Sequence, residues 1–263
     1  AAHDDYSALI VKALAEQGVG ADVVSGGELE LALACGVDPD AIVMSGVGKT
    51  DAELDRAISV GSRGILSIHV ESIEELARVA ARARALGRRA RVSFRINPGI
   101  EANTHAYIAT EHDEAKFGIP RAEIGLALET LLAAPEVDLV GVSSHIGSQL
   151  TEVSGYVTAA RMLLDVARGV EGAVAAEGRA PLELVDFGGG FGIDYGGGCE
   201  AKPADFARAL AALVDSGGRH HRRTLVEPGR SSPPTAQFVQ ASSGPSEPSP
   251  TRSSVDGSSS TRA

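Results

Sequence analysis

The sequence predicts an α/β protein whose main domain is a (β/α)8 barrel of the TIM type. Seven short runs of β-branched and apolar residues alternate with longer stretches that have helical periodicity. Such alternation is typical of a parallel sheet, and seven evenly spaced strands suit a barrel that lacks its first strand. A doubly wound Rossmann-type sheet is the structural alternative, but the G-x-G-x-x-G motif that it needs after the first strand is absent there.

The strands are expected where β-branched residues cluster between turn residues. These runs cover residues 21–25, 41–46, 64–70, 91–97, 139–146, 183–188 and 224–229.

The helices are expected between the strands, where apolar residues recur at helical spacing. Gly18 ends the first helix, Thr50 or Asp51 caps the third, and Ser72 with Glu75 forms a capping box for the fourth. The expected ranges are residues 6–18, 27–36, 50–61, 72–87, 120–133, 154–178 and 203–216.

The composition divides the chain after residue 230. Residues 1–230 form the predicted barrel, whereas residues 231–263 contain 11 Ser and 5 Pro with few apolar residues. Such a segment buries too little surface to fold by itself. We therefore expect a disordered tail, or the product of a shifted reading frame.

The charge and the cysteine content limit the class of protein. The chain has 263 residues, is 43% hydrophobic and has a net charge of −11, which argues against binding to nucleic acid. The sequence contains no apolar run of membrane-spanning length, and its two cysteines form neither a disulfide framework nor a metal cluster. We expect a cytoplasmic protein that binds no nucleic acid, no membrane and no metal.

Unusual residues follow the expected strands, at the end of a barrel where enzymes of this fold carry out chemistry. The motifs are SGGE (25–28), SGVGKT (45–50), HIGSQ (145–149), DFGGGFG (186–192) and EPGR (227–230). Three consecutive glycines indicate either a tight connection or a close approach of the backbone to a ligand such as phosphate. SGVGKT lacks the first glycine of a P-loop at the required spacing.

These motifs, in this order, resemble the diaminopimelate decarboxylase family of the fold-type III pyridoxal-phosphate enzymes, which includes ornithine decarboxylase and alanine racemase. The resemblance starts near residue 5, ends at Arg230, and includes THAYIAT (104–110) and AKFGI (115–119). It implies an alanine racemase-like barrel, pyridoxal 5'-phosphate as cofactor, a C-terminal β-domain and a homodimer. The implied reaction is decarboxylation of meso-2,6-diaminopimelate to L-lysine by a carboxy-lyase.

The resemblance also implies the roles of individual residues. His145 stacks on the pyridine ring, Glu227 pairs with the pyridine nitrogen, and Arg230 reaches a substrate carboxylate as well as the cofactor. Asp22 and Glu28 are weaker candidates, and Glu28 could simply cap a helix. The phosphate is held by Gly188, Gly189, Gly190, Ser148, Gly229 and Arg230.

Two family features are not found in the sequence. The family's Schiff-base lysine lies on the first barrel strand, upstream of the motif that contains Asp22, but no lysine precedes Lys12. No strand-rich segment follows Arg230 where the β-domain is expected. We therefore expect this chain, as written, to have little activity. The alternatives are a related arginine, ornithine or carboxynorspermidine decarboxylase, and a non-catalytic pyridoxal-phosphate-binding barrel.

Overall fold

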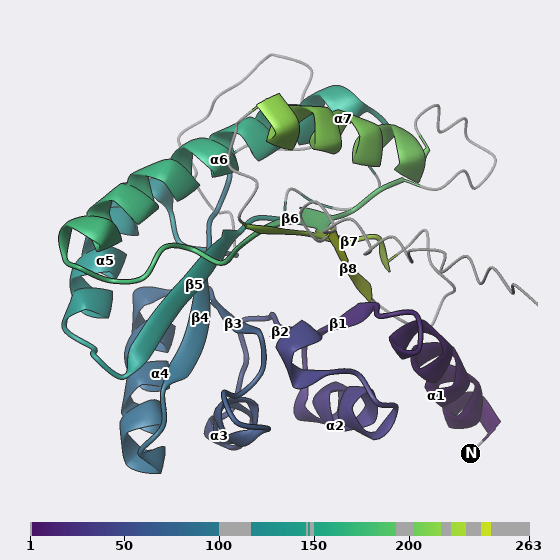
Figure 1. Ribbon diagram of the computed structural model, residues 1–263, viewed down its shortest axis with the longest axis horizontal. Helices are drawn as coiled ribbons and strands as arrows, with labels where there is room; N and C mark the ends of the chain where they lie inside the picture. The colour runs from purple at the N-terminus through teal and green to yellow at the C-terminus, as the bar shows by residue number, and fades with distance from the viewer. Residues whose placement is uncertain are drawn as a thin grey trace, which may run out of the picture.

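The chain folds as a closed barrel of strands surrounded by helices, in agreement with the predicted fold class (Figure 1). The computed structural model describes residues 2–99, 117–145, 147, 150–192, 202–216, 222–229 and 238–242, with the backbone alone for residues 2–7 and 238–242.

The strands follow one another around the barrel in chain order. Each of the first six pairs in parallel with the next, and the register shifts between Val92 and Ser93 where β4 meets β5. The parallel strands are β1 (Gly20–Val23), β2 (Ile42–Met44), β3 (Ser67–Val70), β4 (Ala90–Arg95), β5 (Val137–Ser143), β6 (Leu184–Gly189) and β7 (Arg223–Glu227).

An eighth strand, β8 (Phe238–Ser242), lies antiparallel between β7 and β1 and closes the barrel. This corrects two expectations, because we predict no strand after residue 230 and a barrel that lacks one strand. Two strand edges without partners expose a row of backbone hydrogen-bonding groups, and a short strand satisfies both rows whatever its hydrophobic pattern. The other residues of the segment 231–263 lie outside the described part of the chain.

The helices pack around the outside of the strands (Figure 1). Their N-termini carry the expected caps: Thr50 forms a complete capping box with Glu53, and the hydroxyl of Ser72 accepts a hydrogen bond from the backbone N–H of Glu75. The helices are α1 (Ala2–Ala15), α2 (Gly26–Ala34), α3 (Asp51–Ser59), α4 (Ile73–Leu86), α5 (Ile124–Leu132), α6 (Val153–Ala176) and α7 (Pro203–Ser216). None of the described helices is long and apolar enough to cross a membrane.

The barrel interior changes from apolar to polar along the strands. A small apolar cluster inside the barrel contains Leu184 of β6 and Leu225 of β7. Two residues further along the same strands, Asp186 and Glu227 point to the same side, because side chains alternate with a period of two. The carboxyl end of the barrel is therefore polar above an apolar base, and we call its cluster of Asp22, His69, Asp186 and Glu227 the chamber.

Candidate active site

The structure brings three of the predicted site elements together at the carboxyl end of the barrel. His145 follows β5, the glycine run ends β6, and Glu227 ends β7. His145 Nδ1 lies 3.5 Å from Glu227 Oε2 and accepts a hydrogen bond of 3.4 Å from the backbone N–H of Gly189. Gly229 follows β7 at the same end, whereas Ser148 and Arg230 lie outside the described residues.

The glycine run fits its place because larger residues would collide with the neighbouring strands. Gly188 has φ +64°, and a Cβ there would lie 2.5 Å from the carbonyl oxygen of Ser144. A Cβ at Gly189 would lie 1.7 Å from the carbonyl oxygen of Glu227. Gly190 also has a positive φ, of +85°. The neighbouring strands thus leave no space for side chains at Gly188 and Gly189. The same lack of side chains allows the backbone to approach a ligand closely.

Asp186 supports the glycine turn from below. Its Oδ1 accepts a hydrogen bond of 2.9 Å from the backbone N–H of Gly188, and Gly190 O accepts one of 2.8 Å from the backbone N–H of Leu150. An aspartate that bonds to the backbone two residues ahead is a local turn signal. The sequence DFG contained this signal, but our sequence interpretation did not assign Asp186 a role.

Three carboxyl groups share the chamber and disfavour ionisation of one another. Burial raises the pKa of Asp22 to about 7; the hydrogen bond with Ser45 opposes this shift, and the charge of Asp186 adds to it. Burial also raises the pKa of Asp186, with Glu227 adding to the effect. Burial and Asp22 together raise the pKa of Glu227. The chamber therefore favours a cation or a proton beside these carboxyl groups.

His69 is a chamber residue that the sequence interpretation missed, since its position on a strand suggested a packing role. It is buried on β3, its Nδ1 lies 3.2 Å from Ser45 Oγ, and its Nε2 lies 3.8 Å from Asp186 Oδ2. Burial lowers the pKa of His69 to about 3, helped by the charges of Lys49 and Arg95, so the ring is neutral at physiological pH. Only the alternation along β3 could have indicated its direction.

Charged side chains form a hydrogen-bonded network at the edge of the chamber. Glu71 Oε1 accepts hydrogen bonds from Arg95 Nη1 at 2.6 Å and from the backbone N–H of Gly46 at 2.8 Å. Glu75 Oε2 accepts one from the backbone N–H of Glu71 at 2.8 Å, and Glu75 Oε1 pairs with Lys49 Nζ at 2.9 Å. The carboxylate of Glu75 therefore serves Lys49 and Glu71 and does not complete the predicted capping box.

Lys49 belongs to the SGVGKT motif, but its amine already makes three hydrogen bonds. Besides Glu75, its Nζ donates to Gly46 O at 2.5 Å and to His69 O at 2.7 Å. The ammonium group has three N–H donors, so these contacts use all of them. Glu28, in turn, acts locally: its Oε2 accepts from the backbone N–H of Val24 at 2.7 Å, beside the cap residue Ser25 of α2.

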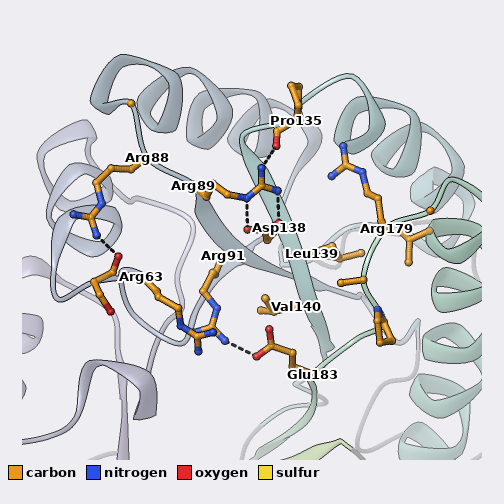
Figure 2. Close-up of a pocket in the computed structure, with 16 residues that line it drawn as sticks. Arg63, Arg88, Arg89, Arg91, Pro135, Asp138, Leu139, Val140, Arg179 and Glu183 are labelled. Carbon is orange, nitrogen blue, oxygen red and sulfur yellow. Dashed lines mark hydrogen bonds and ion pairs between the residues drawn. The ribbon is translucent and has the colours of Figure 1, made fainter.

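A cleft lined by five arginines lies away from these motifs (Figure 2). It has a volume of about 850 Å³. Arg89 pairs with Asp138, and the buried Arg91 pairs with Asp40 at 2.5 Å and Glu183 at 2.7 Å. None of the predicted site residues lines this cleft. Its ion pairs link the strand starts to the preceding loops, which indicates a stabilising role.

Comparisons with known proteins identify the family of this chain. The family model described as "Pyridoxal-dependent decarboxylase, pyridoxal binding domain" matches residues 4–232. Diaminopimelate decarboxylase of Zymomonas mobilis is 38% identical over 226 residues, covering 86% of this chain and 51% of the relative. That of Neisseria meningitidis serogroup B is 40% identical over 222 residues, covering 84% of this chain and 51% of the relative.

The crystal structure of diaminopimelate decarboxylase from Helicobacter pylori complexed with L-lysine is similar, with a TM-score of 0.71 and 37% identity. The match covers 86% of this chain and 54% of that chain. This chain thus spans about half the length of the relatives that it matches. It belongs to the family of pyridoxal-dependent decarboxylases, of which it matches the pyridoxal binding domain.

Proposed function

We propose that this chain is the pyridoxal phosphate-binding barrel of a diaminopimelate decarboxylase, which converts meso-2,6-diaminopimelate to L-lysine and carbon dioxide. The observation that carries the proposal is the meeting of His145, Glu227 and the glycine run at one end of the barrel. The similarity to named diaminopimelate decarboxylases supports the choice of substrate. A homodimer and a cytoplasmic location, as in the family, stay predictions.

The residues present fit the cofactor at both of its ends. Gly188, Gly189 and Gly190 offer backbone without side chains, in which a phosphate is bound by N–H groups. Glu227 offers a half-buried carboxyl group for the pyridine nitrogen, and the ring of His145 is 30% exposed and so free to contact the cofactor face. The resemblance adds Ser148, Gly229 and Arg230 to the phosphate contacts.

Pyridoxal phosphate, when bound, supplies an electron-withdrawing ring that accepts the electron pair left when carbon dioxide departs. Glu227, as a carboxylate, would hold a proton at the pyridine nitrogen, and the positive charge there would offset the burial and the nearby Asp22 that raise the pKa of Glu227. Asp186 fixes the glycine turn through the N–H of Gly188. Arg230 would bind a substrate carboxylate through its two-pronged guanidinium group.

The first experiment tests cofactor binding. The purified chain is titrated with pyridoxal phosphate, then treated with borohydride, and modified peptides are mapped by mass. We expect saturable binding, and we expect Glu227→Gln to change the absorption spectrum of the bound cofactor. We expect no adduct on Lys49, because its amine is fully hydrogen bonded. Absence of any binding would refute the proposed cofactor, and a specific lysine adduct would contradict the expectation that this chain has little activity.

The second experiment tests the substrate. The probes are reduced, stable conjugates of phosphopyridoxal with meso-diaminopimelate, L-ornithine or L-arginine, whose affinities are compared by calorimetry. We expect the diaminopimelate conjugate to bind most tightly, and Arg230→Ala to remove this preference, because only that conjugate carries a second carboxylate. Tighter binding of the ornithine or arginine conjugate would assign the chain to another decarboxylase of the family.

A further inference from the structure

Three potential metal ligands from three strands meet inside the chamber. His69 of β3, Asp186 of β6 and Glu227 of β7 each offer one ligand atom, and these atoms all lie within 4.8 Å of one another. His69 Nε2 and Asp186 Oδ2 are 3.8 Å apart. A tetrahedral ion with bonds of about 2.1 Å holds two ligand atoms about 3.4 Å apart. Small side-chain movements therefore suffice to place an ion between them.

Two of these groups are held in position by one hydrogen bond each, while the other polar atom of each side chain makes none. The hydrogen bond of His69 Nδ1 with Ser45 Oγ fixes the ring, and that of Asp186 Oδ1 with Gly188 fixes the carboxylate. His69 Nε2 and Asp186 Oδ2 are both fully buried and without a hydrogen bond. Buried polar atoms without a partner are rare in proteins, and a second hydrogen bond that orients the ligand is typical of metal sites.

The carboxyl groups of the chamber also favour a positive partner. Asp22 adds a third buried carboxyl group next to Asp186 and Glu227. Within the described residues, no lysine or arginine forms an ion pair with any of the three, because Lys49 is bound to Glu75 and Arg95 to Glu71. A buried cluster of this kind is stabilised by a cation.

We propose that the chamber, in the absence of pyridoxal phosphate, binds one divalent transition-metal ion through His69, Asp186 and Glu227, and that metal and cofactor exclude each other. One imidazole nitrogen with carboxylate oxygens suits Zn²⁺ and Co²⁺ better than Mg²⁺, which prefers oxygen ligands alone. The exclusion rests on the proposed function, because it needs Glu227 at the pyridine nitrogen. Metal binding itself does not rest on it.

No pattern in the sequence indicated this site, and our sequence interpretation expected no metal. The three ligands lie on three different strands with no ligand-like spacing along the chain. Parallel strands of a barrel bring their carboxyl ends together, so only the closed fold shows the cluster.

The test uses Co²⁺ as the probe, added to the cofactor-free chain and followed by visible absorption and calorimetry. We expect one saturable site, and at least a tenfold loss of affinity in His69→Gln. Glu227→Gln serves as a second ligand variant, and circular dichroism checks that each variant is folded. The control removes His220 and His221, which are adjacent in the sequence, and should leave Co²⁺ affinity unchanged. Equal affinity of both ligand variants and wild type, or loss of binding in the control, would overturn the site.

A second arm tests the exclusion. Pyridoxal phosphate chelates metals in solution, so its aldehyde-free analogue 4-deoxypyridoxine phosphate is the competitor. We expect saturating analogue to lower the apparent Co²⁺ affinity at least tenfold. If Co²⁺ and the analogue bind together, the exclusion is refuted while the metal site stands. If the analogue binds and Co²⁺ does not, the metal site is refuted while the proposed function stands.

Discussion

The carbonyl oxygen of Glu227 occupies the space that a Cβ at Gly189 would need, at a separation of 1.7 Å. The backbone of β7 cannot move away without breaking its pairing with β6 at this same position. We expect Gly189→Ala to destabilise the chain by about 3 kcal/mol or more, the range of overpacking and backbone strain together. Urea unfolding followed by circular dichroism measures the loss.

Gly169 provides the matched control for this prediction. It lies exposed within α6, and a Cβ there would meet no atom within 4 Å. Gly169→Ala should stabilise the chain by about 0.5–1 kcal/mol, because alanine is the better helix former. Equal effects of the two substitutions would show that the glycines of the site are not held by packing.

Asp22 and His69 contribute to the pH dependence of stability with opposite signs. The pKa of Asp22 rises from its ordinary value of 3.8 to about 7 in the folded chain. The folded chain therefore binds more protons between these pH values, and the contribution of Asp22 to stability falls as the pH rises. The pKa of His69 drops from 6.5 to about 3, so its contribution falls as pH decreases below 6.5.

Single substitutions separate the two contributions. Relative to wild type, Asp22→Asn should gain stability as pH rises from 4 to 7, by at most about 4 kcal/mol. His69→Gln should gain relative stability as pH falls from 6.5 towards 4. Urea unfolding at several pH values, with EDTA present to remove metal, measures both differences. A constant difference between Asp22→Asn and wild type would contradict the raised pKa.

Lys49 pairs with Glu75 in a setting where both side chains are more than nine-tenths buried. Removing one partner leaves a buried charge without compensation, so Lys49→Met should cost about 3–5 kcal/mol. The double variant Lys49→Met with Glu75→Gln should recover part of this loss, because no buried charge remains. A double-mutant cycle from urea unfolding gives the coupling, and additive effects would refute a direct interaction.

Arg91 is the buried member of the arginine-lined cleft, with only 5% of its side chain exposed (Figure 2). It joins Asp40, whose pKa is lowered by Arg91 and Arg63 against the effect of burial, to Glu183. We expect Arg91→Ala to cost about 1–3 kcal/mol, since two charge-assisted hydrogen bonds are lost. Arg63→Ala, at a side chain that is 57% exposed, should cost under about 1 kcal/mol. Thermal unfolding compares the two variants.

The sequence was sufficient to predict the barrel because strand and helix periodicities alternate without interruption. It also placed His145 and Glu227 at strand ends, where the structure finds them beside each other. It missed His69 because a histidine on a strand has no local signal of the direction in which it points. It missed β8 because pairing with two existing edges depends on backbone groups, which composition does not report.

The fluorescence of Tyr156 can report on the site. The sequence contains no tryptophan, so tyrosine emission is not masked. The buried ring of Tyr156 packs edge-on against Phe191 at 5.4 Å, and Phe191 directly follows Gly190 of the glycine run. A pyridoxal ring bound at that run absorbs in the near ultraviolet and would accept excitation energy from this tyrosine. Loss of tyrosine fluorescence would then report occupancy of the chamber without any added label.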